Sequence, residues 1–321
     1  MDSPIIDVID RRLIQALQTD GRAPFNRIGE VIGVSDQTAA RRYRRLRAAG
    51  LLNVIGQTDP WHTGESRWGL RVQVSPDSAV AVAEALAARP DTAWVQLVSG
   101  GSEINCVVQT RGDLQRDQLL LHKLPRTSRV IGFSAHAVLH QYFGGDGQSP
   151  PLVDELDADQ IAALQPESAS PEAAVALTDG DLPLVIALRR DGRATYAELA
   201  AATGWSETTC RRRLNELRGR GELYFDVDID GAALGFNCSA VVWLSVPPAH
   251  LAEVGTAMAA HPEAAAVLAT TGPTNLFAAV ICRDLPALYD YINVKLGALP
   301  AIRHLEVNPV IRGLKGAGSR P

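Results

Sequence analysis

Residues 20–52 have the sequence DGRAPFNRIGEVIGVSDQTAARRYRRLRAAGLL, and residues 191–223 repeat it as DGRATYAELAAATGWSETTCRRRLNELRGRGEL. With a constant shift of 171 residues and no gap, 13 of the 33 positions are identical, whereas unrelated sequences would agree at about two. An internal repeat defines the structural unit of a fold, so it is interpreted before other features. The chain is therefore predicted to carry two copies of one small module with an arginine-rich end.

The first copy of the module predicts three helices. Apolar residues at helical spacing predict a helix over 7–19, and Gly21, as a left-handed C-cap, is expected to end it. A second helix is expected from about Pro24 to Ile32, followed by a tight turn and a third helix over about 36–49 that Ser35 caps. Helix, short glycine turn and helix form the helix-turn-helix layout. The same pattern predicts helices in the second copy at about 182–190, 195–203 and 207–220.

Each helical module is followed by the pattern of a second kind of domain. Alternating apolar residues predict strands, and the intervening segments predict helices. The order is β-α-β-β-α-β, which is the ferredoxin-like motif. In the first half we expect strands at 68–75, 93–99, 104–110 and 129–142, with helices at 77–88 and 114–122. In the second half we expect strands at 239–246, 264–270, 275–282 and 302–311, with helices at 249–260 and 284–297.

The composition is that of a globular protein, with 46% hydrophobic residues and a net charge of −5. Its apolar runs are too short to span a bilayer, and we expect neither a membrane segment nor a signal peptide, hence a cytoplasmic location. The four cysteines lie far apart in sequence and fit no zinc ribbon, so buried reduced thiols are expected. No metal or other cofactor is predicted.

The charge is distributed unevenly, and this bears on binding to a polyanion. Residues 35–50 contain five arginines and one acid, and residues 206–221 contain five arginines and two acids. Residues 146–181 contain many acids but no lysine or arginine. Local fields decide where DNA docks, so the third helix of each module is the candidate DNA-binding element.

The expected third helices place their apolar residues on one stripe and their polar residues on the opposite face. Short polar side chains near a helix N-terminus can approach base edges, and arginines can bind guanine or phosphate. The alternative for one copy is an ordinary solvated basic face, but two copies with the same layout favour DNA binding. The predicted DNA-binding residues are Ser35, Gln37, Thr38, Arg41, Arg42 and Arg45 in the first copy, and Ser206, Thr208, Thr209, Arg212 and Arg213 in the second.

The first copy resembles the DNA-binding domain of the Lrp/AsnC (feast/famine) family of prokaryotic regulators. The residues that carry the resemblance are Asp10, Asp20-Gly21-Arg22, Gly33, Ser35, Arg42, Leu46 and Gly50. The β-α-β-β-α-β unit is similar to the effector-binding and oligomerisation (RAM) domain of that family. A turn of the type Thr-Gly-x-x-Asp between the second and third strands marks that domain. This chain has Ser99-Gly100-Gly101-Ser102-Glu103 and Thr271-Gly272-Pro273-Thr274-Asn275 at these positions.

The resemblance implies an amino acid or related small effector bound near these turns. The implied effector-binding residues are Gly100, Gly101, Ser102, Glu103, Gly272, Thr274 and Asn275. Turn N–H groups can hold a carboxylate, and Glu103 or Asn275 can meet an amino group. The alternative is that both turns only connect strands and build an interface, since glycine turns are frequent for conformational reasons alone.

We therefore predict an α+β protein in which two winged or helix-turn-helix domains alternate with two ferredoxin-like domains, paired within one chain as a pseudo-dimer. The expected boundaries are 1–58, 66–143, a linker at 144–178 with a short helix near 157–164, 179–230 and 236–315. The expected function is that of a sequence-specific transcriptional regulator, not an enzyme. Its expected partners are double-stranded DNA, a small-molecule effector and further copies of itself, in dimers or higher oligomers.

Two alternatives come from other functional classes. Sirohaem decarboxylases resemble this family in both domains, but the chain lacks their His-x-Tyr-x-Arg signature. A metabolite sensor that no longer binds DNA would suit the acidic linker and the negative net charge. His136 and His140 have the spacing of a helical zinc site, but we expect them on a strand, where about 13 Å separates such positions.

Overall fold

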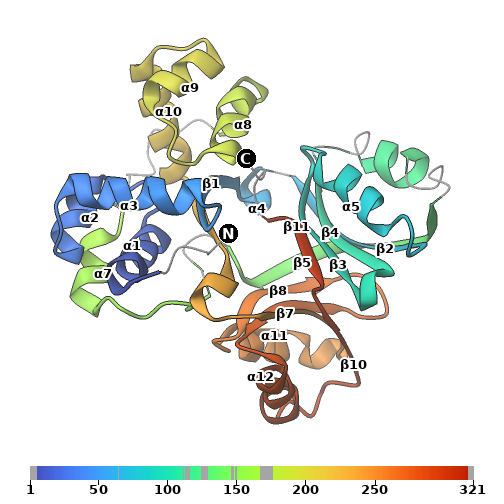
Figure 1. Ribbon diagram of the computed structural model, residues 1–321. Coiled ribbons are helices and arrows are strands. Elements are labelled where there is room, and N and C mark those ends of the chain that lie inside the picture. Colours follow the sequence, from blue (N-terminus) through green and yellow to red (C-terminus); the bar gives the residue numbers. More distant parts are fainter. Residues whose placement is uncertain are drawn as a thin grey trace. The chain divides into compact units, whose positions relative to one another are not determined.

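The computed structural model describes residues 6–63, 65–110, 112, 116–123, 129–145, 148, 150–166 and 176–316. The chain divides into two units, and each contains one part from either half of the sequence. Residues 1–63 and 151–234 form the first unit, and residues 64–150 and 235–320 form the second. Each unit therefore brings the two copies of one kind of domain together (Figure 1).

The first unit contains the two helix-turn-helix domains and is mainly helical. The first copy consists of α1 (Val8–Thr19), α2 (Phe25–Ile32), α3 (Asp36–Ala48), β1 (Leu52–Thr58) and the short α4 (Pro60–Thr63). The second copy consists of α8 (Leu182–Arg190), α9 (Tyr196–Thr203), α10 (Glu207–Gly219) and β6 (Leu223–Ile229). All six predicted helices are present, within a residue or two of the expected bounds.

The strand that follows the third helix in one copy pairs with the equivalent strand of the other copy, and the two copies, as far as the structure describes them, do not form separate wing hairpins. Strands β1 and β6 make a two-stranded antiparallel sheet in which Ile55 lies opposite Asp226. These two residues are also 171 positions apart, so they occupy the same place in the repeat. A pair of equivalent residues facing each other lies on a two-fold axis. The first unit is therefore a pseudo-symmetric dimer of domains within one chain.

The segment expected to be a linker includes an ordered part of the first copy. Helix α7 (Ala158–Leu164) is capped by Asp157 and lies beside α1 and α2 (Figure 1). The Arg27 guanidinium donates to the carbonyls of Ala163 (2.7 Å) and Gln165 (3.0 Å). Four apolar side chains before and within the helix are buried, namely Leu152, Val153, Leu156 and Leu164. The short helix predicted there is present, and it packs as a fourth helix.

The second unit contains two ferredoxin-like domains that share one nine-stranded sheet. The first copy provides β2 (Ser66–Val74), α5 (Ala79–Ala87), β3 (Thr92–Val98), β4 (Glu103–Thr110), a π-helical segment at Gln118–Lys123 and β5 (Val130–Phe143). The second provides β7 (Cys238–Ser245), α11 (Leu251–Ala259), β8 (Ala264–Thr270), β9 (Leu276–Cys282), α12 (Leu285–Asp290), which continues as a π-helix to Leu296, and β10 (His304–Pro309) and β11 (Arg312–Lys315). Part of the helix expected at 114–122 lies outside the described residues.

The last strand of each ferredoxin-like domain also joins the other domain. The strand order is β10-β7-β9-β8-β5-β2-β4-β3-β11, and all neighbours in it are antiparallel. The first part of β5 pairs with β2 and its end pairs with β8. In the second copy one strand was expected at 302–311, but the chain forms two, of which β10 pairs with β7 and β11 with β3. The pairing of β5 with β8 and of β11 with β3 thus connects the strands of the two copies.

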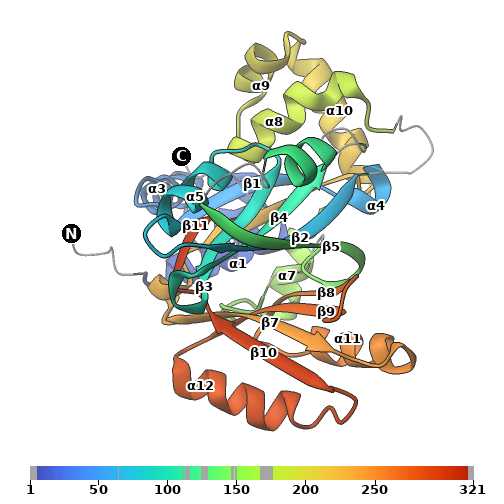
Figure 2. The ribbon, with the colours of Figure 1, turned by 90° about the vertical axis from the view of Figure 1, so that its right-hand side faces the viewer.

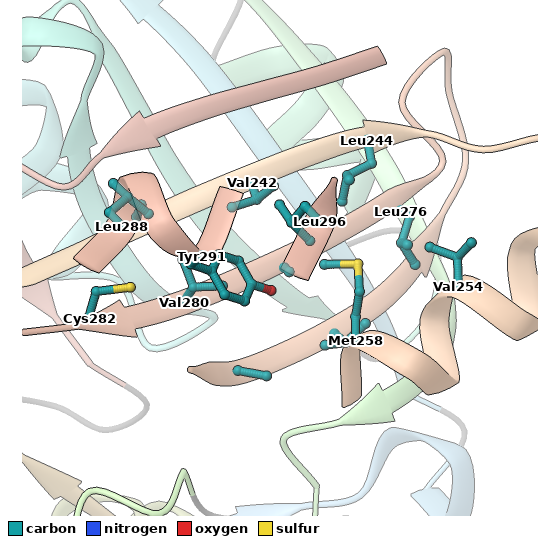
Figure 3. Close-up of a cluster of buried hydrophobic side chains, with 14 of the residues drawn as sticks. Val242, Leu244, Val254, Met258, Leu276, Val280, Cys282, Leu288, Tyr291 and Leu296 are labelled. Atoms are coloured by element: carbon teal, nitrogen blue, oxygen red, sulfur yellow. The ribbon is translucent and has the colours of Figure 1, made fainter. Parts of the chain in front are cut away.

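Each ferredoxin-like domain has its own core between its strands and its helices. In the second copy, α11 and α12 cover one side of the strands (Figure 2), and Met258, Tyr291 and Leu296 pack against β7 and β9 (Figure 3). The other face of β7 carries Val241 and Trp243, which cluster with Val98 of the first copy. The aromatic Trp243 is 1% exposed, so burial of its ring contributes to holding the two copies together.

Candidate nucleic-acid interface and effector turns

The two third helices, α3 and α10, are the candidate recognition helices, and both begin with the same cap. In α3, Ser35 Oγ accepts from the Thr38 backbone N–H (3.2 Å), and in α10 Ser206 Oγ accepts from that of Thr209 (3.1 Å). The serine and threonine hydroxyls of each copy also lie within hydrogen-bond distance of each other, at 3.0 and 2.9 Å. A cap of this kind satisfies N–H groups that the helix leaves free and fixes its first turn. These four predicted residues shape the start of the recognition helices.

Some of the residues predicted to face the bases are exposed, and others are not. Gln37, Arg41 and Arg45 are exposed on α3, and Thr208 and Arg212 are exposed on α10. On the opposite stripe Ala39, Tyr43 and Leu46 are buried, as are Cys210, Leu214 and Leu217 in the second copy. The amphipathic division predicted for the third helices is therefore present in both copies.

Arg42 and Arg213 occupy the same repeat position, and both form ion pairs inside their own domain. The Arg213 side chain is 8% exposed, and its Nε and Nη2 donate to the two carboxylate oxygens of Asp181 at 2.6 and 2.7 Å. Hydrogen bonding to Asp181 raises the pKa of the Arg213 guanidinium. The prediction that Arg213 lies on the exposed face is wrong, because the buried carboxylate requires a cation beside it.

In the first copy the same position is more open. Arg42 Nη1 donates to Asp10 at 2.9 Å and to Asp7 at 2.7 Å, and Arg45 also binds Asp10. Asp10 is fully buried, whereas the Arg42 side chain is 22% exposed. Arg42 is thus a structural cation at the edge of the predicted DNA face, and its hydrogen bonds to Asp7 raise its pKa.

The repeated Asp-Gly-Arg-Ala turns form the contact between the two helix-turn-helix domains. Arg22 donates to the carbonyls of Gly192 (2.6 Å) and Ala194 (3.1 Å), and Arg193 donates to those of Gly21 (2.6 Å) and Ala23 (2.9 Å). Both guanidinium groups are largely withdrawn from water, and burial lowers the pKa of Arg193 to about 10. Such reciprocal contacts are expected of an isologous interface.

A second pair of reciprocal contacts joins each recognition helix to the other domain. Arg47 on α3 binds Asp191 (2.7 Å), and Arg218 on α10 binds Asp20 (2.9 Å). Sequence reasoning assigned none of these residues a function, although all of them are identical between the repeats. That identity was the available signal, since an isologous interface uses the same residues twice.

The glycine of the repeated turn has a different role from the one expected. Gly21 does not have the positive φ of a left-handed C-cap, and Asp20 before it is extended. A Cβ added at Gly21 would lie 2.9 Å from the Cβ of Phe225 and from Val54 Cγ1. At Gly192 a Cβ would lie 2.9 Å from the backbone of Val54. Glycine is needed here because the two copies approach each other closely.

In the second unit, the first predicted effector turn is exposed, but its acid already has a cation. Gly100 and Gly101 have positive φ values of 69° and 88°, and a Cβ at either would meet open space. Glu103 is buried and accepts from Arg71 Nε (2.9 Å) and Nη2 (3.0 Å). Arg71 also binds Glu306 of the second copy and lowers the pKa of that carboxyl. Ser102 remains exposed, with its hydroxyl donating to the Ser99 carbonyl (2.8 Å).

The second predicted effector turn is exposed at Gly272, but its last two residues are packed within the domain. Asn275 accepts from the Val246 N–H (2.9 Å) and donates to its carbonyl (2.8 Å), so its amide is used within the domain. Gly272 has φ of 108°, and a Cβ there would lie 2.3 Å from His136 Nδ1. Thr274 is 9% exposed. The two turns therefore present different surfaces to any ligand.

The candidate metal-binding and membrane features give no positive finding. His136 and His140 lie on β5, as predicted, and His136 Nδ1 is 2.8 Å from the Thr271 carbonyl oxygen. Across the described ranges, no group of three or more His, Cys, Asp or Glu side chains is placed to hold a metal ion. A search of the same residues finds no helix with the length and apolarity that crossing a membrane requires.

Comparisons with known proteins agree with this architecture. The model of the AsnC-type helix-turn-helix domain matches residues 6–47 and again 177–218, and that of the Lrp/AsnC ligand binding domain matches 239–319. The HTH-type transcriptional regulator FL11 of Pyrococcus horikoshii is 26% identical over 148 residues, which cover 46% of this chain and 97% of that protein. The regulator Ptr1 of Methanocaldococcus jannaschii is 25% identical over 142 residues, covering 44% and 96%.

The fold of the whole chain is found in solved structures of a siroheme decarboxylase. The crystal structure of the siroheme decarboxylase NirDL matches 98% of this chain and 94% of its own, with a TM-score of 0.62 and 15% sequence identity. At this identity the likeness concerns the fold alone, and it includes the alternation of helical and ferredoxin-like domains. With two AsnC-type helix-turn-helix domains and an Lrp/AsnC ligand-binding domain in tandem, the chain belongs to the Lrp/AsnC family.

Proposed function

We propose that this protein is a sequence-specific DNA-binding transcriptional regulator in which one chain supplies both halves of a pseudo-dimer. The observation that carries the proposal is the pair of serine-capped recognition helices, which are held together by reciprocal contacts of Arg22, Arg193, Arg47 and Arg218. In the dimers of the family, two subunits supply the two recognition helices. A fixed pair of recognition helices can address two half-sites of a duplex.

The base-contacting residues we propose are the exposed ones. They are Gln37, Arg41 and Arg45 on α3, and Thr208 and Arg212 on α10. We assign Ser35, Thr38, Ser206 and Thr209 to the starts of the helices, and Arg42 to the ion pair at the edge of the predicted DNA face. Contact with phosphate through their backbone or outer atoms is compatible with these positions. The two sets differ in sequence, so an asymmetric operator with unlike half-sites is expected. We place this activity in the cytoplasm, where a prokaryotic regulator meets its DNA.

The test is binding of the purified full chain to its own upstream DNA and to a scrambled duplex, by fluorescence anisotropy over a salt series. We expect preference for the native duplex and an affinity that falls steeply with salt, because arginine contacts to phosphate release counterions. Arg41→Ala should weaken specific binding by about 1–3 kcal/mol. Arg190→Ala, on the exposed end of α8, is the matched control and should not change it. Equal binding to native and scrambled DNA across genomic fragments and effectors would contradict the proposal.

We further propose that a small molecule of the amino-acid class modulates this binding through the second unit. The ligand-binding domain match at 239–319 supports this. Because Glu103 and Asn275 are occupied by Arg71 and Val246, the exposed residues Gly100, Ser102 and Gly272 are the more accessible of the predicted effector residues. A panel of amino acids added to the anisotropy assay should contain one that shifts the affinity, and calorimetry should show it binding without DNA. A panel without effect on either readout would contradict this part.

Self-association belongs to the same proposal. Since the two copies already pair within one chain, the monomer takes the place of a family dimer, and assemblies are expected in multiples of this pseudo-dimer. Light scattering of the full chain over a concentration series tests this expectation. A stable species made of two chains exchanging their helix-turn-helix domains would contradict it.

The decarboxylase alternative rests on the shared fold with NirDL and on a partial signature. His140 and Tyr142 occupy the first two positions of His-x-Tyr-x-Arg, but Gly144 stands at the third. The Tyr142 hydroxyl lies 3.4 Å from the Leu251 carbonyl, and a Cβ at Gly255 would overlap its ring. Tyr142 therefore has a packing role, and we propose that the chain is not a decarboxylase. A sirohaem absorbance spectrum on mixing, with release of carbon dioxide, would contradict this.

A further inference from the structure

The two recognition helices carry opposite charges at one repeat position. Arg45 of α3 and Glu216 of α10 are 171 residues apart and therefore equivalent. Each follows, by one helical turn, the exposed arginine that we propose to contact bases, namely Arg41 or Arg212. Residues four apart lie next to each other on a helix surface, so this position controls the surroundings of that arginine.

On α3 the equivalent position leaves the base-contacting arginine free. Arg45 is a second arginine, not an acid, and it binds Asp10, which Arg42 also contacts at 2.9 Å. Within the part of the chain that the structure describes, Arg41 has neither a hydrogen bond nor an ion pair. Its guanidinium can therefore approach DNA without first breaking a contact.

On α10 the residue at the equivalent position, Glu216, forms an ion pair with Arg212, one turn earlier in the same helix. Arg212 Nη1 donates to Glu216 Oε1, and Arg213 Nη1 donates to Glu216 Oε2 at 3.1 Å. The Glu216 side chain is 19% exposed, whereas that of Arg212 is 64% exposed. Glu216 is thus held from below by the structural Arg213 and faces outward toward Arg212.

We infer that Glu216 makes α10 the weaker of the two recognition helices and makes α3 the anchor of the protein on its operator. This inference rests on the proposed DNA binding. Two effects act in the same direction. Arg212 must leave Glu216 to reach a guanine or a phosphate, and the carboxylate repels the phosphates beside the half-site of α10. An exposed ion pair is itself weak, so repulsion of phosphate is the larger effect.

A double-mutant cycle in the full chain tests the inference. Arg41→Ala, Arg212→Ala, Glu216→Gln and the double variant Arg212→Ala/Glu216→Gln are compared on one operator duplex. We expect a loss of affinity of about tenfold or more for Arg41→Ala but only about twofold to threefold for Arg212→Ala. Glu216→Gln should raise affinity by about threefold to tenfold, because it removes a charge that faces phosphate and keeps an oxygen for Arg213.

The cycle also predicts a coupling between Arg212 and Glu216. In the Glu216→Gln background, Arg212→Ala should cost about tenfold, as Arg41→Ala does in the unmodified chain. Glu84→Gln makes the same change in net charge at an exposed residue of α5, in the other unit, and is the matched control. It should leave the affinity unchanged, and circular dichroism should show that every variant keeps its helices.

Two results would overturn the inference. One is an equal loss for Arg41→Ala and Arg212→Ala in the unmodified chain, and the other is a Glu216→Gln variant that binds no better than Glu84→Gln. A different result would reach further: if the unmodified chain does not distinguish the operator from a scrambled duplex, the proposed function itself fails and the asymmetry with it. The unmodified chain therefore separates the two failures before any variant is compared.

Discussion

The two helix-turn-helix copies use the same acid and arginine in different degrees of burial. Asp181 and Arg213 form a two-oxygen ion pair beneath α10, with the arginine side chain 8% exposed. Asp10 of the first copy is shared by Arg42, which is 22% exposed, and by Arg45. Both copies keep a buried carboxylate that needs a cation, but only the second encloses that cation. Identity between the repeats therefore marks many of the structural contacts, while the exposed faces of the helices have diverged except at positions such as Arg41 and Arg212.

The same comparison explains why so many repeated arginines do not face DNA. Arg22 and Arg193 bind the backbone of the opposite copy, and Arg47 and Arg218 bind its acids. Among the repeated arginines that the structure describes, Arg41 and Arg212 form the pair that is exposed on the predicted DNA-binding face of both copies. Positive charge on a helix is thus divided between holding the pseudo-dimer and meeting a polyanion.

The largest expected effect separates the two buried ion pairs. Arg213→Ala should lower the free energy of unfolding by about 3–5 kcal/mol, because it leaves Asp181 buried without its cation. Arg42→Ala should cost about 1 kcal/mol, since Arg45 still contacts Asp10 and the Arg42 side chain is partly exposed. Urea unfolding followed by circular dichroism measures both. Equal costs would mean that burial does not distinguish the copies.

A second test uses the residue pair on the pseudo-two-fold axis, Ile55 and Asp226. Burial raises the pKa of Asp226 to about 6, so the folded state holds a proton more tightly than the unfolded chain does. Ionised Asp226 therefore opposes folding above its folded pKa, and the penalty declines as the pH falls toward the unfolded value. Asp226→Asn, which mimics the protonated form, should stabilise the protein, and its advantage should be about 2 kcal/mol larger near about pH 7.5 than near about pH 4.5.

The control for the axial acid lies a few residues along the same segment. Asp230 is exposed and accepts from the Ala232 N–H, which asparagine can also do. Asp230→Asn removes the same charge from an exposed position, and its effect on stability at the two pH values is the reference for Asp226→Asn. An Asp226→Asn variant whose stability gain does not grow with pH beyond that of Asp230→Asn would contradict the raised pKa of Asp226.

The smallest expected effect concerns the two reciprocal ties. Arg47 pairs with Asp191 at 2.7 Å and Arg218 with Asp20 at 2.9 Å, and both arginines are partly exposed. Each change to alanine should cost about 0.5 kcal/mol of stability. Thermal unfolding of the two single variants should give similar midpoints, because the contacts are equivalent by pseudo-symmetry. A large difference between the midpoints would show that the two equivalent contacts contribute unequally to stability.

Much of the fold followed from local patterns in the sequence. The helical spacing, the Ser35 and Ser206 caps and the alternating strands are short-range features, and the elements they predicted are present. The prediction of one continuous strand at 302–311 was wrong, because the chain forms β10 and β11, which pair with strands from different domains. Pairing partners far apart in the chain leave no mark on local periodicity.

The candidate site was predictable to a smaller extent. The polar stripe of α3 and α10 could be assigned from helical geometry, since the apolar stripe opposite has to be buried. The burial of Arg213 could not, because it depends on Asp181, which lies 32 residues earlier in the chain. The binding of Arg71 to both Glu103 and Glu306 likewise needs three segments from two domains.

By itself, the sequence determined that the chain is a tandem repeat, which helices and strands each copy forms, and which family it resembles, because these depend on neighbouring residues and on the comparison of one copy with the other. Only the tertiary structure decided which charges are free. It showed that Gly21 permits close approach instead of capping a helix, that Arg213 is enclosed while Arg41 is exposed, and that Asp226 meets Ile55 on the axis. The reason is physical: the state of a charge depends on the groups that fold around it, and those groups come from distant parts of the chain.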